Sequence, residues 1–254
     1  MKIQEIFERD ITRHINAAVV VGDDKKEIID SEIKEYVFTR DLVKHIYKML
    51  DTILNGKSGK SGIWINGYYG SGKSHFLKYV HYCLHPDYKE EALLHLETSL
   101  AGLESDIDDV TPAQIRKLKN QLEKQEVDTI LFNVDNVSGD QNNERITRIF
   151  VNQFNKFRGY NASNIPLARL LEKQLDKEGV FDAFKKKLKE KKFDWEKDSD
   201  TISRLRLDTV LAVAAELMPG ISIDVLKTAL KDPSTFHISI DDTFIPEFQE
   251  YLAS

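Results

Sequence analysis

The chain has 254 residues, of which 41% are hydrophobic and 31% charged, enough to fill the core of one large domain or two small ones. No run approaches the ~18 apolar residues of a membrane span, the opening residues lack the apolar core of a secretory signal, and the single cysteine excludes an internal disulfide or a cysteine-cluster metal site. The formal net charge of −6 argues against a broadly basic, nucleic-acid-binding surface, and we expect a cytoplasmic protein.

Residues 1–60 are expected to form an N-terminal lead-in that contains a strand and helices. The apolar residues 17–21 fit a strand or an extended segment. Thr39 is a candidate N-cap for a helix that Asn55 and Gly56 close. The apolar positions of this helix recur at helical spacing: Leu42, Val43, Ile46, Met49, Leu50 and Ile53.

A complete G-x-x-x-x-G-K-S motif begins at Gly67 and ends at Ser74. Residues 63–65, Ile-Trp-Ile, predict a short buried strand that enters the motif. Apolar residues at helical spacing follow it: Phe76, Leu77, Val80, Cys83 and Leu84. A strand, a glycine-rich turn and a helix are the context that a phosphate-binding loop requires, so the sequence predicts binding of a nucleoside triphosphate. Cys83 lies on the apolar face of the helix and is expected to be a core residue.

Each position of the motif meets a physical need of a bound triphosphate. Glycines allow successive backbone N–H groups to turn toward the phosphates, and the N-terminus of the following helix adds a favourable dipole. Lys73 supplies a charge for the β- and γ-phosphates, and the Ser74 hydroxyl is a ligand for a bridging Mg²⁺. We expect the bulky Tyr68 and Tyr69 side chains to pack against neighbouring elements. The predicted nucleotide-binding residues are Gly67, Tyr68, Tyr69, Gly70, Ser71, Gly72, Lys73, Ser74 and His75.

The segments after the motif predict an α/β fold. Residues 86–126 are polar and mostly helical, with breaks at Pro86 and Pro112, and residues 129–134 form a second apolar run that ends at Asp135. A helix with apolar residues up to Phe157 follows. Strand, loop, helix, strand, helix is typical of a parallel sheet with right-handed crossovers, so we predict an α/β fold with a parallel P-loop NTPase sheet. The predicted domains are 1–60, the first part of the P-loop core at 61–160, and a helical insertion at 161–254.

Helical patterns dominate the predicted insertion. One helix follows Pro166, another follows Gly179, and a longer one covers about 201–218 and ends before Pro219. Residues 236–240 alternate like a short strand. The stretch 185–192, Lys-Lys-Lys-Leu-Lys-Glu-Lys-Lys, fits a solvated helix face, with contact to a DNA backbone as the alternative.

The second catalytic element is less clear from the residues. Asp135 is a candidate to hold Mg²⁺ and assist catalysis, but Asn136 follows it where many ATPases have a second acid, so a plain polar end to the strand is the alternative. An N-K-x-D motif for guanine is absent because Arg158 follows Asn155, Lys156 and Phe157. ATP is therefore the predicted nucleotide. In the common arrangement of P-loop ATPases the residue that contacts adenine would lie around residues 17–21, at no single assignable position.

Several segments together resemble the N-terminal part of the BrxC/PglY-type P-loop ATPases of bacteriophage-exclusion (BREX) and phage growth limitation systems. They are residues 6–11 with Arg13 and Ile15, residues 35–39, the extended motif at 63–78, and residues 131–135. The resemblance covers essentially the whole chain. It implies an AAA+-like ATPase that works as a homo-oligomer in an antiviral defence complex with a DNA methyltransferase and other components, and that acts on phage DNA without a membrane partner.

The same resemblance implies that family members are longer and that their acidic metal-holding strand follows a segment like 236–252. On that basis we expect an incomplete sheet of the AAA+-like type and an N-terminal part that binds ATP weakly or partly and hydrolyses it poorly alone. The alternatives are a nucleotide-binding scaffold without turnover and a purely structural interaction domain. An arginine acting across a subunit contact is not assignable among Arg145, Arg148 and Arg204.

Overall fold

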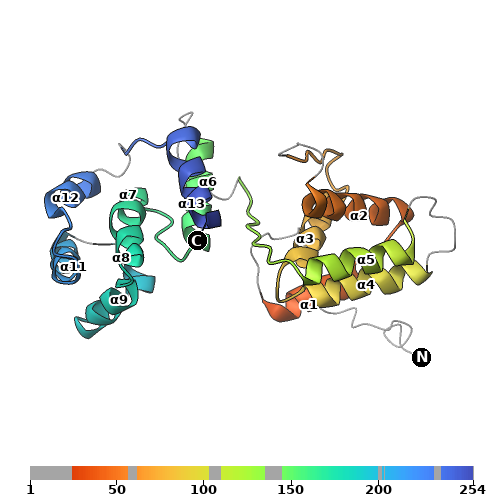
Figure 1. Ribbon diagram of the computed structural model, residues 1–254, viewed down its shortest axis with the longest axis horizontal. Coiled ribbons are helices and arrows are strands. Elements are labelled where there is room, and N and C mark those ends of the chain that lie inside the picture. The colour runs from red at the N-terminus through yellow and green to blue at the C-terminus, as the bar shows by residue number, and fades with distance from the viewer. Residues whose placement is uncertain are drawn as a thin grey trace, which may run out of the picture. The chain divides into compact units, whose positions relative to one another are not determined.

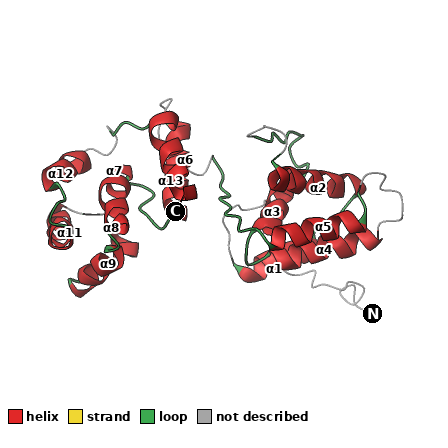
Figure 2. Ribbon diagram, in the orientation of Figure 1, coloured by secondary structure: helices red, strands yellow, loops and turns green. Residues whose placement is uncertain are grey.

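The computed structural model describes residues 25–56, 62–102, 110–134, 145–199, 202, 204–231 and 236–253. All regular structure in these ranges is helical, and they contain no strand (Figure 2). The predicted α/β parallel sheet is therefore wrong for the part of the chain that the structure describes. The chain divides into two compact units, Met1–Phe132 and Asn133–Ser254, which are described separately below.

The error arose at the two apolar runs that were predicted to be strands. Residues 62–68 and 126–133 have no regular structure. An apolar run becomes a strand only when its backbone pairs with a neighbouring strand, and periodicity alone does not supply that neighbour. The predicted burial also fails, since Trp64 is 90% exposed and Val134 49% exposed. Residues 236–240 were also predicted to alternate like a short strand, but 236–239 have no regular structure and Ile240 begins a π-helix.

The first unit is a bundle of helices (Figure 1): α1 Lys26–Glu35, α2 Arg40–Asn55, α3 Lys73–Leu84, α4 Lys89–Gly102 and α5 Pro112–Glu123. Helix α4 packs against α3 and α5, α2 packs against α5 and α3, and α1 packs against α4. The predicted bounds of α2 are confirmed. Thr39 Oγ1 accepts a hydrogen bond from Leu42 N, and Gly56 ends the helix in the left-handed conformation.

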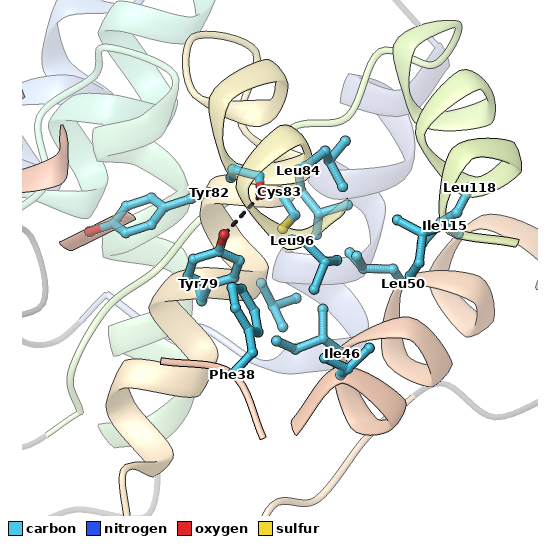
Figure 3. Close-up of a cluster of buried hydrophobic side chains, with 14 of the residues drawn as sticks. Phe38, Ile46, Leu50, Tyr79, Tyr82, Cys83, Leu84, Leu96, Ile115 and Leu118 are labelled. Carbon is cyan, nitrogen blue, oxygen red and sulfur yellow. Dashed lines mark hydrogen bonds between the residues drawn. The ribbon is translucent and has the colours of Figure 1, made fainter. Parts of the chain in front are cut away.

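Apolar side chains from all five helices form the core of this unit. Figure 3 shows part of this core, with the Tyr82 ring turned away from the other labelled side chains: Phe38, Ile46, Leu50, Tyr79, Cys83, Leu84, Leu96, Ile115 and Leu118. Cys83 is fully buried, as predicted, and burial raises the pKa of its thiol. Tyr79 donates its hydroxyl hydrogen to Ala92 O at 2.8 Å, which ties α3 to α4. The helix that begins at Lys73 is thus held firmly by its buried face.

A charged pair also fixes α3 against α1. Lys78 is only 4% exposed, and its Nζ lies 2.6 Å from Glu32 Oε2. The Tyr82 hydroxyl donates to the same carboxylate. Removing one partner of such a buried pair leaves an uncompensated charge, so the pair fixes how the two helices meet.

The second unit begins at α6 Arg145–Phe157 and continues with α7 Ile165–Leu167, the π-helix η3 Ala168–Glu172 and α8 Lys173–Lys177. It then runs through α9 Phe181–Glu190, α10 Trp195–Asp198, α11 Arg204–Leu217 and α12 Ile223–Lys231 to a second π-helix, η6 Ile240–Phe244, and α13 Ile245–Ala253. Its main core gathers Leu171, Phe184, Leu188, Trp195 and Val210. In the parts of both units that are described, no helix has the length and apolar content needed to cross a membrane.

Ion pairs join α8 to α13, and they give a pH-dependent contribution to stability. Lys173 Nζ and Lys177 Nζ each lie 2.6 Å from the Glu250 carboxylate, and these hydrogen bonds, that of Lys173 first, lower its pKa from 4.5 to about 2. A folded-state pKa below the unfolded value gives stability that is present above pH ~4.5 and lost as the pH falls toward 2.

We expect Glu250→Gln to lower the free energy of unfolding at pH 7 by less than ~1 kcal/mol, because the carboxylate is largely exposed and screened. The difference from wild type should shrink below pH ~4.5 and vanish near pH 2. Urea denaturation of both proteins across this range measures it. A difference that is the same at every pH would contradict the ion-pair origin.

Candidate nucleotide-binding site

The motif from Gly67 to Ser74 forms a loop that leads directly into α3. Ser71 N donates to Tyr68 O at 3.2 Å, which closes a turn with Gly70 at a φ of 78°. Gly72 then caps α3 with a φ of 83°, a left-handed conformation that costs other residues about 1–2 kcal/mol. A methyl group on Gly67 would lie 2.9 Å from Ser71 Oγ, so the Gly67 backbone and the Ser71 side chain approach closely. The glycine positions of the motif thus match the backbone that they occupy.

The Lys73 side chain forms hydrogen bonds back to the loop that precedes it. Its Nζ donates to Gly67 O at 3.0 Å and Tyr68 O at 2.7 Å, and it lies 3.4 Å from Ser71 Oγ. Within the described residues these contacts are to carbonyl and hydroxyl oxygens and include no carboxylate. Phosphate oxygens could therefore take the place of these carbonyls around the ammonium.

The start of α3 adds backbone donors at the same place. Phe76 N bonds back to Gly72 O, whereas the N–H groups of the three preceding residues have no acceptor one turn earlier in the helix. Ser74 and His75 are exposed at this end. Ser74 is therefore placed in the first turn beside Lys73, open to solvent, where its hydroxyl could reach a phosphate-bound Mg²⁺. His75 shares this exposure, and no contact in the described structure gives it a further role.

The two tyrosines of the motif contradict one expectation. Tyr68 is 92% exposed and Tyr69 is 105% exposed, so neither packs against a neighbouring element as predicted. Trp64, a few residues before the loop, is similarly exposed. Tyr68 and Tyr69 were expected to pack because they are bulky, but they lie in the turn that the Ser71 N to Tyr68 O hydrogen bond closes, where their side chains remain in solvent.

The other predicted site residues either lie outside the described residues or belong to the second unit. Asp135 lies outside the described residues, as does the predicted adenine-contacting stretch 17–21. Arg148 Nη2 donates to Phe236 O at 2.8 Å, a contact within the second unit, and the side chains of Arg145 and Arg204 are not described. No group of three or more metal-ligating His, Cys, Asp or Glu side chains occurs in the ranges described.

A polar cavity of about 340 Å³ lies between α2 and α5, and its lining includes no residue of the loop. Tyr47, Asp51, Thr52 and Asn55 line it from α2, and Gln114, Lys117 and Gln121 line it from α5. Partial burial, and then the Asp51 charge, raise the pKa of Tyr47. The cavity is therefore separate from the phosphate-binding geometry.

The Ser71 hydroxyl lies between Gly67 and Lys73, and the motif does not specify this contact. The sequence placed Ser71 among the predicted nucleotide-binding residues, but its position in the variable part of the motif did not indicate this contact. A scan against protein-family models finds no match to this chain, and no solved structure matches it.

Proposed function

We propose that this chain binds Mg-ATP through the loop from Gly67 to Ser74. The observation that supports this most is the Lys73 ammonium, which is held over Gly67 O and Tyr68 O at the N-terminus of α3. Backbone N–H groups, a helix dipole and a mobile cation together favour a polyphosphate. We infer ATP rather than GTP because the sequence lacks the N-K-x-D motif that binds guanine.

The residues that resemble BrxC/PglY-type ATPases extend this proposal. Nucleotide occupancy would change the conformation or assembly of a defence complex that acts on phage DNA, and efficient turnover would need an acidic residue to hold Mg²⁺ opposite Ser74. Asp135 is the candidate that the sequence offers within this chain. A nucleotide-binding scaffold without turnover is the alternative, and a Lys73-dependent phosphate release assay on this chain distinguishes the two.

Calorimetric titration with four ligands tests the binding proposal: Mg-ATP, Mg-GTP, magnesium triphosphate and AMP. We expect Mg-ATP to bind at one site, triphosphate to bind there more weakly, and AMP to give no signal, because the loop contacts the β- and γ-phosphates. Trp64 is exposed near the loop, so its fluorescence gives a second readout. AMP binding as tight as that of ATP, or an absence of binding by both ATP and triphosphate, would refute the proposal.

A further inference from the structure

The second unit carries a cluster of cations at the C-terminal end of α9. Four exposed lysines and one exposed arginine form it, and we call it the α9 basic end: Lys186, Lys189, Lys191, Lys192 and Arg206. Arg206 comes from α11, and its Nη1 lies 3.5 Å from Lys191 O and 3.4 Å from Lys192 O. The fold therefore adds a cation from a second helix to the basic stretch that is visible in the sequence.

Neighbouring carboxylates neutralise only part of the basic stretch. Lys187 forms an ion pair with Glu216, and Lys185 Nζ lies 3.8 Å from Glu196 Oε1. Lys186, Lys189 and Lys192 form no ion pair with the residues that the structure describes, although Asp182 and Glu190 share the outward face of the helix. Positive charge is thus in excess at the end of α9, in a chain whose net charge is −6.

The backbone at Lys192 adopts a conformation that is unfavourable for lysine. Lys192 has a φ of 59°, and the hydrogen bonds Phe193 N to Leu188 O and Lys192 N to Lys189 O form a Schellman motif. Glycine is the usual residue at this left-handed position, and lysine is strained there. A lysine at such a position is an outlier that points to a role for its side chain.

We propose that the α9 basic end contacts the phosphate backbone of double-stranded nucleic acid without reading its sequence. The apolar residues nearby, Phe181, Phe184, Leu188 and Phe193, are buried, so none is available to insert into a membrane or to stack on the bases of a single strand. Exposed cations whose apolar neighbours are buried fit the closely spaced phosphates of a duplex. This surface is independent of the proposed nucleotide-binding loop.

The test measures binding to a labelled 30-base-pair duplex by fluorescence anisotropy at several salt concentrations. The variant is Lys186→Glu/Lys189→Glu/Lys192→Glu, and the control is Lys124→Glu/Lys156→Glu/Lys231→Glu, which changes the net charge equally at exposed lysines elsewhere. We expect at least about tenfold weaker binding for the variant alone, with a salt slope reduced by about 3. Both proteins also carry Lys73→Ala, so that the loop does not contribute.

A second variant separates function from folding. Lys192→Gly should raise the urea midpoint, because glycine relieves the left-handed strain, and should weaken duplex binding. Three results with the duplex would overturn the proposal: no binding by the parent protein, an equal loss of affinity in both triple variants, or unchanged affinity of Lys192→Gly. The proposal would also fail if the parent protein bound polyglutamate, a single strand or anionic vesicles more tightly than the duplex.

Discussion

Replacing Lys73 with alanine should weaken Mg-ATP binding at least about 100-fold while leaving the fold intact. A hydrogen bond between an ammonium and a phosphate contributes about 1.5–3 kcal/mol, and 1.4 kcal/mol corresponds to a tenfold change in affinity. Two such bonds, which replace those that Lys73 Nζ now makes to Gly67 O and Tyr68 O, account for the expected loss. Calorimetry and Trp64 fluorescence measure it.

Two further variants show whether the loss is specific to position and geometry. Lys124→Ala removes an exposed lysine of the same unit and should bind Mg-ATP like the wild type. Lys73→Arg keeps the charge but replaces a compact ammonium with a planar, larger group, and it should still lose most of the affinity. Equal affinity of Lys73→Ala and wild type would remove Lys73 from the site and with it the proposed function.

The melting temperature provides the folding control for these variants. The bonds of Lys73 are solvent-exposed, so losing them should lower the free energy of unfolding by only about 1 kcal/mol. A far-UV circular dichroism melt close to that of the wild type would show that a loss of binding is local to the loop.

The sequence predicted helices better than strands, and the reason is physical. Both ends of α2 could be predicted because Thr39 and Gly56 act within one turn of the helix. The run at residues 63–65 has the composition of a strand, but strand formation depends on a partner that lies far away in the sequence. Local sequence signals therefore predicted the ends of α2 correctly, whereas the sheet that they predicted was wrong.

For the candidate site too, the sequence predicted local features and not the surroundings. The motif indicated which residues form the loop, and Gly70 and Gly72 adopt the left-handed conformation that favours glycine. It did not specify that Lys73 would bond to the carbonyls of its own loop, nor that Tyr68 and Tyr69 would lie in solvent. Those features depend on what surrounds the loop in three dimensions.

Glu172 is a residue whose importance no sequence pattern indicates. It lies in the π-helix η3, where the usual helical spacing does not apply, and it is 1% exposed. Glu172 Oε1 accepts a hydrogen bond from Trp195 Nε1 at 2.6 Å, and Oε2 accepts one from Asn161 N at 2.6 Å. One carboxylate thus ties α10 and the loop after α6 to the middle of the second unit.

We expect Glu172→Ala to lower the free energy of unfolding of this unit by about 3–5 kcal/mol. The indole and backbone N–H groups would remain buried without acceptors, at about 1–3 kcal/mol each, and a cavity would form beside them. Glu172→Gln keeps the volume and one acceptor oxygen, so its loss should be about half as large. Urea denaturation followed by Trp195 fluorescence measures both losses in a Trp64→Phe background, which leaves Trp195 as the single tryptophan.

The matched control for this prediction is Glu178→Ala, which removes an exposed carboxylate at the end of α8 in the same unit. It should change the free energy of unfolding by less than ~0.5 kcal/mol, because its charge is solvated in both states. If Glu172→Ala and Glu178→Ala gave equal losses, the two hydrogen bonds of Glu172 would contribute nothing beyond their cost of burial. The order alanine, then glutamine, then wild type is expected because each step restores one acceptor to a buried N–H group.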